Sequence, residues 1–352
     1  MKIPDPELAP DVSLWCDHIN ARELEDGGCT SIVVGLYPIT VNGKKVLNPI
    51  CRKQCIEVAT HSSMVLQAYY WDDITKNAVE QADWLADTLA TEGLPIKWVW
   101  ADQEQWWSDW AAWYQARRGE ITWDLVPRAT PANISIHNLA FSRHFHEHFP
   151  AHGVYTNRGF VSSWAAPMDT WLMDYKAWVP HYGRQPSPAV KMTWSQLKES
   201  WLPNYNIILS AGQPEINVMG HQFTGDACIL PGSYTQYNQA QPLDVNVFRK
   251  TFIDQLRGGA PVPNPFPLPP PQPAHPDICP TCLQAWPQTA QDYLEYIVTY
   301  TRVNVRDLTG AWLRYAVKDE IVKVKLPIKR PQTGYIQLTD AMIWEEYIKP
   351  KG

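Results

Sequence analysis

Short hydrophobic runs alternate with helix-like patterns along most of this 352-residue chain. Apolar residues at helical spacing predict a helix over residues 76–93, where a glycine ends the pattern, and a second helix over residues 132–149. Strands that alternate with helices favour a parallel α/β architecture, and a barrel accommodates this length in one domain. The runs interpreted as strands are TSIVVGLYP (30–38), SMVLQAYYW (63–71), IKWVWADQE (96–104), HGVYTNRGF (152–160), DTWLMDYKAW (169–178) and INVMGHQFTG (216–225).

Two segments interrupt the alternation. Residues 105–130 break it directly after a predicted strand, which indicates an insertion beside the strand end. Nine prolines between positions 261 and 276 forbid helix and central strand and favour a stiff polyproline II spacer. The β-prone pieces that follow predict a small β-barrel. We therefore expect an α/β barrel domain over residues 1–257, a linker over 258–278 and a second domain over 279–352.

Composition narrows the range of partners. Hydrophobic residues make up 45% of the chain and charged residues 19%, so it can bury a large core. A formal net charge of −6 gives no attraction for a phosphate backbone and argues against nucleic acid. The 18 tryptophans and 16 tyrosines suit stacking on sugar rings, although core packing accounts equally well for about half of the tryptophans.

The N-terminus and the cysteines give little further information about the function. The N-terminus lacks an apolar leader, and no run reaches the ~18 apolar residues of a membrane span, so we expect no cleaved signal and no span. Seven cysteines leave at least one without an intrachain partner. Cys51 and Cys55 are spaced C-x3-C, and Cys279 and Cys282 form CPTC. A zinc site would require a second such pair, so a plain thiol pair or a local disulfide is favoured.

The run WVWADQE ends in two carboxylates. Residues i and i+2 of a strand share a face, about 6.5 to 7 Å apart. Trp98, Trp100, Asp102 and Glu104 therefore share one face, and Gln103 lies on the other. Neighbouring carboxylates raise one pKa, so that one stays protonated, as glycoside hydrolysis requires. On spacing alone, two solvated acids at the end of a strand are the simpler interpretation.

The surrounding motifs resemble glycoside hydrolase family 25, the lysozymes (N-acetylmuramidases) of bacteria and phages. The resemblance covers roughly residues 9 to 250, and it implies an irregular TIM-like (β/α) barrel with eight strands. It also implies cleavage of the β-1,4 bond between N-acetylmuramic acid and N-acetylglucosamine, without metal or other cofactor. The motifs, in the order of that family, are PDVSLW (10–15), AYYW (68–71), WADQE (100–104), VYTNRGF (154–160), TWLMDY (170–175), HQFTG (221–225) and LDVNVF (243–248).

The resemblance also implies roles for single residues. Glu104 becomes the general acid, and Asp102 becomes the partner that stabilises the intermediate by orienting the substrate's 2-acetamido group. Asp11 and Asp244 match the two further acids of the family. One position departs from the pattern, because Gly220 and His221 precede the glutamine where the family has tryptophan. The implied substrate-binding residues are Tyr69, Trp71, Tyr155, Trp171, Tyr175 and Gln222, and core packing is the alternative for about two of the five aromatic residues.

Two further patterns leave alternatives open. Trp106, Trp110 and Trp113 of the insertion have helical spacing, and they either lengthen a glycan groove or plug the barrel mouth. In RHFHEHF only His144 and His148 share a helix face, and no carboxylate motif completes a metal site, so a solvated face is favoured.

The segments RVNVRDLTG (302–310) and TGYIQLTDAMIWEEYI (333–348) resemble a bacterial SH3-like domain, a module that commonly binds wall peptide. A packing or assembly domain is the alternative. The hypothesis is an endolysin-like muramidase that is made in the cytoplasm and reaches the bacterial wall by lysis-type release, or within a virion or secretion particle. The alternatives are an inactive wall-binding or structural particle component and a glycosidase for another N-acetylated glycan such as chitin.

Overall fold

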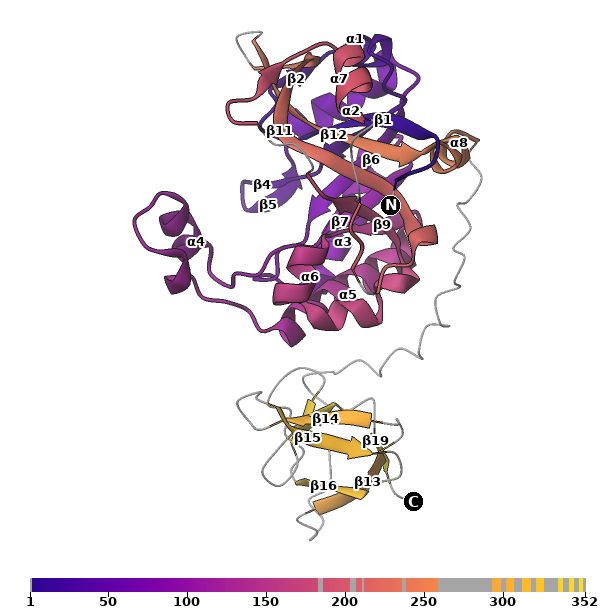
Figure 1. Ribbon diagram of the computed structural model, residues 1–352. Helices are drawn as coiled ribbons and strands as arrows, with labels where there is room; N and C mark the ends of the chain where they lie inside the picture. The colour runs from indigo at the N-terminus through magenta and orange to yellow at the C-terminus, as the bar shows by residue number, and fades with distance from the viewer. Residues whose placement is uncertain are drawn as a thin grey trace. The chain divides into compact units, whose positions relative to one another are not determined.

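A closed eight-stranded barrel forms the first part of the chain (Figure 1). The computed structural model describes residues 2–182, 186–202, 207–210, 212–235 and 239–258, together with seven strands between residues 293 and 350. The barrel strands are β1 (Pro6–Val12), β3 (Ser31–Gly35), β6 (Val65–Trp71), β7 (Trp98–Asp102), β8 (His152–Tyr155), β9 (Lys176–Pro180), β11 (Val218–Tyr234) and β12 (Ala240–Arg249).

The barrel is irregular because one strand runs against the others. The strands from β1 through β3, β6, β7, β8 and β9 to β11 pair in parallel. Strand β12 closes the ring by antiparallel pairing with both β11 and β1. The predicted fold class, an irregular α/β barrel, is therefore confirmed.

Helices cover the barrel on two sides in Figure 1, with α3, α5 and α6 on one side and α1, α2 and α7 on the other. The helices are α1 (Ala21–Asp26), α2 (Pro49–His61), α3 (Ala78–Glu92), α4 (Trp110–Arg117), α5 (Pro131–His148), α6 (Arg158–Trp164), α7 (Trp194–Ser200) and α8 (Lys250–Gly258). Both predicted helices form. The Asn77 side chain caps the start of α3, and Gly93, in the left-handed region at φ 60°, ends it.

Four of the predicted strands overlap β3, β6, β7 and β11, although β3 ends at Gly35 and β11 continues to Tyr234. Two further predictions need correction. The run 152–160 is a strand only to Tyr155, because the Asn157 side chain caps α6 by accepting a hydrogen bond from the Phe160 amide. The run 169–178 is wrong over most of its length. Short 3-10 turns occupy Ala166–Thr170 and Leu172–Asp174, and β9 begins only at Lys176. The apolar residues of those turns pack into a cluster beside α6, which their spacing did not reveal.

Large aromatic side chains fill the barrel interior. Trp98 and Trp100 of β7 point inward and pack against Phe252 of α8, while Val99 and Ala101 face the surrounding helices. The predicted alternation along β7 is therefore confirmed. Gly153 leaves the space for this packing, since a Cβ atom there would lie 2.6 Å from the Trp100 ring. The packed aromatic side chains thus hold the end of β7, where Asp102 and Glu104 lie, in a fixed position.

The second compact unit spans Pro271–Gly352, and the first spans Met1–Pro270. The second unit contains two antiparallel sheets, one with strand order β16-β13-β19 and one with order β15-β14-β18-β17. The SH3-like assignment and the boundaries at 257 and 279 remain predictions, and most of the proline-rich segment lies outside the described residues. The strands are β13 (Tyr293–Val298), β14 (Arg302–Arg306), β15 (Trp312–Val317), β16 (Ile321–Lys325), β17 (Tyr335–Gln337), β18 (Met342–Trp344) and β19 (Ile348–Pro350).

Within the part of the chain that the structure describes, no helix has both the length and the apolar character needed to cross a bilayer. Five cysteines fall in that part and all of them are buried, and Cys16, Cys29, Cys51 and Cys55 are free thiols. Cys51 and Cys55 both lie on α2 and form no disulfide, while the CPTC motif lies outside the described residues.

Candidate active site

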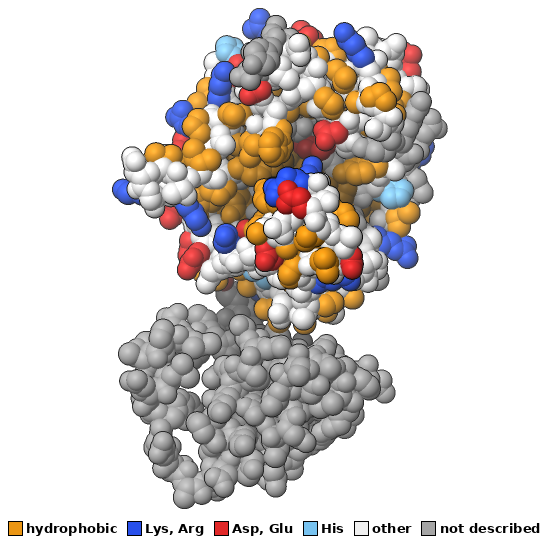
Figure 2. Space-filling model, turned by 90° about the vertical axis from the view of Figure 1, so that its left-hand side faces the viewer, with side chains coloured by type: hydrophobic (Ala, Val, Ile, Leu, Met, Phe, Trp, Pro, Cys, Tyr) orange, Lys and Arg blue, Asp and Glu red, His pale blue; other side chains and the backbone are white. Residues whose placement is uncertain are grey.

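A cavity of about 590 Å³ opens at the carboxyl-terminal ends of the parallel barrel strands. The hairpin of β4 (Pro38–Val41) and β5 (Lys44–Leu47) and helix α4 extend on this side in Figure 1. Figure 2 shows the same side hollowed, with acidic and hydrophobic side chains around the hollow. The cavity is lined by Asp11, Val12, Ser13, Trp15, Cys16, Tyr37, Tyr69, Arg117, Asp226, Gln241, Pro242 and Asp244.

Asp11 and Asp244 lie directly opposite each other in the pairing of β1 with β12. Because β12 is antiparallel, a residue near its start meets a residue near the end of β1. The Gln222 amide of β11 joins them, donating to Asp11 Oδ2 at 2.9 Å and to Asp244 Oδ2 at 3.2 Å. Asn246 also donates to Asp11 Oδ2, at 2.8 Å. Both acids are therefore held in fixed positions by amide donors.

Asp102 and Glu104 stand at and just beyond the end of β7. Asp102 is only 6% exposed, and its Oδ1 atom has no hydrogen-bond partner within the described residues. The Asn157 amide, at the N-cap of α6, donates to Glu104 Oε2 at 2.8 Å. The charges of Glu104 and Asp11 both act on Asp102. The structure thus brings the four acids expected from the sequence into one group.

Burial shifts the titration of all four acids in the same direction. It raises the pKa of Glu104 to about 7, against the opposing effect of the Asn157 hydrogen bond. It raises the pKa of Asp11 to about 6, against the hydrogen bonds from Asn246 and Gln222. Burial, reinforced by the neighbouring carboxylates, also raises the pKa of Asp102 and of Asp244. At neutral pH the pair Asp102 and Glu104 therefore retains a proton that ordinary carboxyls would lose.

The Asn157 hydrogen bond gives a direct test of which acid donates the proton. Asn157→Asp keeps an oxygen that caps α6, removes the amide donor to Glu104 and adds a negative charge. Both changes raise the pKa of Glu104, so the alkaline fall of kcat/KM should move from about pH 7 to higher pH.

The pH profile of kcat/KM on purified peptidoglycan measures this shift. The matched control is Asn77→Asp, which makes the same change at the N-cap of α3 and should leave the profile unchanged. An alkaline limb in Asn157→Asp at the wild-type pH or below it would rule out Glu104 as the titrating acid.

Gln103, between the two acids, points to the opposite face, as its position in the strand predicts. Its amide donates to Asp72 Oδ2 at 3.1 Å and to the Asn138 carbonyl of α5 at 2.9 Å. Asp72 is fully buried and pairs with His137, whose Nε2 atom lies 2.7 Å from Asp72 Oδ1. This network fixes the end of β7 to the helical layer.

Two of the expected substrate-binding tyrosines lie beside the acids. Tyr69 lines the cavity, and its hydroxyl lies 2.8 Å from that of Tyr37. The Tyr155 hydroxyl donates to Gln222 Oε1 at 2.6 Å, and the Tyr182 hydroxyl donates to the same atom at 2.7 Å. Gln222 is itself only 3% exposed. Gln222 therefore orients Asp11 and Asp244, and its side chain is too buried to stack on a sugar ring.

The structure does not bring Trp171 and Tyr175 to this cavity. Both are buried in the cluster beside α6, where the Trp171 indole donates to Ser135 Oγ at 3.0 Å. Tyr175 packs edge-on against Trp171 and against His152. Core packing, the alternative considered for two of the five aromatic residues, describes these two positions.

The structure also explains why Gly220 and His221 precede Gln222 where the family has tryptophan. His221 is buried, and its Nε2 atom lies 3.0 Å from the His181 carbonyl oxygen. Alternation along β11 turns its side chain away from the face that carries Gln222. At Gly220 a Cβ atom would lie 2.2 Å from the Phe248 ring, so no larger side chain fits. Neither position supplies a wall of the cavity.

The insertion forms a small aromatic subdomain around α4. Trp107 stacks on Trp113 with ring centroids 4.9 Å apart, and Trp71 of β6 lies 5.8 Å from Trp107. The Trp71 indole donates to Gln105, so Trp71 anchors the insertion to the barrel. Arg117 lies over the Trp113 ring at 5.2 Å and lines the acid cavity. The tryptophans thus pack mainly on one another, and Arg117 is the part of α4 that reaches the cavity wall.

Several residues of the site were missed by sequence reasoning. Trp15 lines the cavity with 80% of its surface exposed, although it ends the motif PDVSLW. Asp226, at φ 51° in an irregular stretch of β11, donates its amide to Asp244 Oδ1. Tyr37 lies between β3 and β4, and Arg117 is the last residue of α4; neither has a local sequence signal. For Trp15 and Asn157 the signal was present, since each stands within a quoted motif.

No protein-family model and no curated protein sequence matches the chain. Similar proteins were found only among solved structures. A bacterial lysozyme from Streptomyces coelicolor is 11% identical, covering 72% of this chain and 98% of its own, with a TM-score of 0.49. The spore cortex lytic enzyme SleM of Clostridium perfringens is 14% identical, covering 100% and 98%, with a TM-score of 0.45. A family 25 glycosyl hydrolase from Bacillus anthracis is 13% identical, covering 72% and 92%, with a TM-score of 0.44. At such identities, residue roles depend on the geometry of this chain alone.

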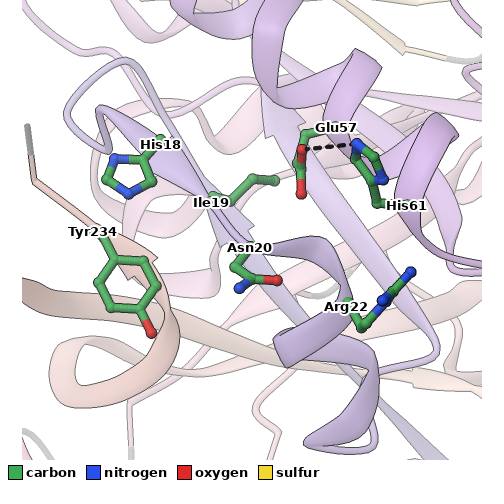
Figure 3. Close-up of a pocket in the computed structure, with 7 residues that line it drawn as sticks. All are labelled: His18, Ile19, Asn20, Arg22, Glu57, His61 and Tyr234. Atoms are coloured by element: carbon green, nitrogen blue, oxygen red, sulfur yellow. Dashed lines mark ion pairs between the residues drawn. The ribbon is translucent and has the colours of Figure 1, made fainter. Parts of the chain in front are cut away.

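A second cavity of about 660 Å³ lies between α1, α2 and the end of β11 (Figure 3). Glu57 and His61 face each other there from α2, with Glu57 Oε2 3.7 Å from His61 Nε2. Glu57 is the single carboxylate among the lining residues, and its Oε1 atom accepts a hydrogen bond from the Ala21 amide. This cavity therefore lacks the paired acids of the first one. Its lining residues are His18, Ile19, Asn20, Arg22, Glu57, His61 and Tyr234.

Proposed function

We propose that the barrel is a glycoside hydrolase of the muramidase type, which cleaves the β-1,4 bond between N-acetylmuramic acid and N-acetylglucosamine in peptidoglycan. One observation carries the proposal. Two carboxylates share the end of β7, the buried Asp102 and the half-buried Glu104, and desolvation raises the pKa of Glu104 to about 7. Glycosidic bond cleavage uses one carboxyl group that donates a proton and a second, ionised carboxylate beside it. The motif resemblance to family 25 points to the same bond.

Glu104 acts first in the proposed mechanism. Its proton moves to the oxygen of the scissile bond, which leaves with the electron pair of the C1–O bond. The Asn157 amide holds the carboxyl in place and stabilises the carboxylate that the transfer produces. After departure of the leaving sugar, the same carboxylate accepts a proton from the water that attacks C1. Glu104 is thereby restored.

Asp102 acts on the substrate's 2-acetamido group. In this mechanism the Asp102 carboxylate, which is 6% exposed, accepts a hydrogen bond from the acetamido N–H and so turns the acetamido carbonyl oxygen toward C1. That oxygen forms the bond to C1 as the leaving oxygen departs, and the Asp102 charge balances the positive charge on the resulting ring. Water then opens this ring and gives the free sugar. Asp11 and Asp244, fixed by Gln222, line the sugar-binding cavity beside this pair.

Arg117 favours peptidoglycan over an uncharged glycan. N-acetylmuramic acid carries a lactyl group whose carbonyl oxygen accepts hydrogen bonds, and in the wall this group bears a peptide with free carboxylates, whereas the repeating sugar of chitin has neither. A guanidinium on the cavity wall provides a complementary donor for these oxygens. The cation also lies over Trp113, which limits its freedom and prepares it for binding.

Trp15 is expected to be a sugar platform. Its side chain is 80% exposed on the cavity wall, where a flat ring can stack on a sugar face. Trp15→Ala should raise KM for soluble peptidoglycan fragments by about tenfold, equivalent to about 1.4 kcal/mol, and leave kcat within about twofold.

Steady-state kinetics on those fragments measures both constants. The control is Trp123→Ala, which removes a half-exposed tryptophan that does not line the cavity, and its KM should be unchanged. A fall in kcat with an unaltered KM for Trp15→Ala would contradict the platform role.

The function is tested by a substrate panel. Purified peptidoglycan and chitin are incubated separately with the full-length protein, and soluble reducing sugar is measured against time. Release from peptidoglycan and not from chitin supports the proposal. Release from chitin alone assigns the barrel to another N-acetylated glycan. Binding to peptidoglycan without release from either polymer makes the chain a wall-binding or structural component and overturns the proposal.

For the second unit we propose an SH3-like module that binds the peptide part of the wall. The support is its content of short antiparallel strands and the proline-rich segment before it, which would raise the local concentration of the barrel at the wall. Action at the wall after lysis-type release, or within a virion or secretion particle, belongs to the same proposal.

A further inference from the structure

Three potential metal ligands from helices α3 and α5 lie close together on the outside of the barrel. His144 and His148 are one turn apart on α5, and Asp83 comes from α3. The metal-ligand atoms of all three side chains lie within 4.8 Å of one another. The sequence pattern RHFHEHF contains only the two histidines. The missing carboxylate comes from a helix some sixty positions earlier in the chain, so it has no sequence signal.

We propose that Asp83, His144 and His148 form a binding site for a divalent metal ion of the zinc class. Imidazole nitrogens select Zn²⁺ and its late first-row neighbours over Mg²⁺ and Ca²⁺, which prefer oxygen ligands. Two histidines and one carboxylate leave one position of a tetrahedral zinc ion for water.

The distances fit such a site after small side-chain rotations. Asp83 Oδ1 lies 2.7 Å from His144 Nε2 and 3.8 Å from His148 Nε2. Ligands of a tetrahedral zinc ion with bonds of 2.0 to 2.1 Å lie about 3.4 Å apart. One separation must therefore lengthen and the other must shorten, each by less than an ångström. The two rings meet edge to face with centroids 5.0 Å apart, which leaves both Nε2 atoms directed at the same carboxylate.

The ligands are accessible and supported. The side chains of Asp83 and His148 are 51% and 49% exposed, and that of His144 is 27% exposed, so an ion can enter from solvent. Glu147 Oε2 lies 3.8 Å from His144 Nδ1. It is placed to accept the Nδ1 hydrogen once Nε2 binds metal, which is the usual outer partner of a metal-bound histidine.

The bound ion would connect α3 to α5, which pack together on the barrel surface. None of its three ligands lines the acid cavity. The expected consequence is stabilisation of this helix pair in the presence of metal, without a direct part in bond cleavage. The inference is independent of the proposed function.

Calorimetric titration of the full-length protein with Zn²⁺ tests the site. The background is Cys279→Ser/Cys282→Ser, which removes the competing CPTC thiols. We expect one Zn²⁺ per chain, and an affinity at least about tenfold weaker in both Asp83→Asn and His148→Ala. The matched control is His61→Ala, which removes another exposed histidine beside a carboxylate, Glu57, and should not change the affinity.

Circular dichroism of each variant checks that it folds, and both substitutions lie at exposed positions. A rise in the unfolding temperature with Zn²⁺ should appear in the background protein and disappear in the two ligand variants. Absence of saturable binding, or binding that Asp83→Asn and His148→Ala leave unchanged, shows that the three residues form only a surface ion pair.

Discussion

Glu104→Gln should reduce kcat on peptidoglycan by about 10²- to 10⁴-fold while substrate affinity stays within about threefold of wild type. Glutamine has the shape of the protonated acid and retains an oxygen for the Asn157 amide, but it has no proton to give to the leaving oxygen. Kinetics on soluble glycan fragments, with binding measured separately by calorimetry, distinguishes the two effects.

Glu57→Gln is the matched control for this variant. It makes the same substitution in the second cavity and should leave kcat and KM unchanged. A Glu104→Gln protein that keeps more than about one tenth of wild-type kcat would show that another group donates the proton.

Asp102→Asn should lower kcat by about 10²- to 10³-fold and at the same time raise stability at neutral pH. Activity falls because the asparagine side chain cannot supply the negative charge that balances the intermediate. Stability rises because Asp102 is buried, near Glu104 and Asp11, and one of its oxygens has no hydrogen-bond partner among the described residues. Removing such a charge raises the free energy of unfolding. Residues of an active site commonly lower the stability of a protein because activity requires them.

The pH dependence of that stability gain has a defined sign. The pKa of Asp102 is raised in the folded protein, so the wild type is most stable below the ordinary pKa of the group and loses stability as pH rises. Asparagine does not titrate. The increase in unfolding temperature should therefore be largest at neutral pH and should shrink below about pH 4. A variant less stable than wild type at pH 7 would contradict this description of the Asp102 site.

The acids were predictable because their signals are local. Alternation along WVWADQE placed Trp98, Trp100 and Asp102 on one face, and the structure places both tryptophans inside the barrel. The same alternation directed Gln103 outward, where it meets α5. The pairing of Asp11 with Asp244 was implied only by family resemblance, because it depends on β12 running antiparallel to β1 across more than 230 positions of sequence.

Other features depend on contacts that no local pattern encodes. Trp171 and Tyr175 match the aromatic positions of a sugar site, but the short 3-10 turns before β9 direct them into a separate core. Arg117 reaches the cavity only because the tryptophans of the insertion pack around Trp71. Asp83 joins His144 only because α3 and α5 lie side by side. Each depends on tertiary packing between elements far apart in the chain.

The central claim is that Glu104 and Asp102 cleave the bond on the reducing side of N-acetylmuramic acid. The most direct measurement is the identity of the new reducing ends after digestion of purified peptidoglycan, reduced with borohydride and identified by mass spectrometry. Wild type and Glu104→Gln are treated in parallel. We predict reduced muramic acid ends from the wild type and almost none from Glu104→Gln. Reduced glucosamine ends from the wild type, or equal amounts of muramic acid ends from both proteins, would contradict the claim.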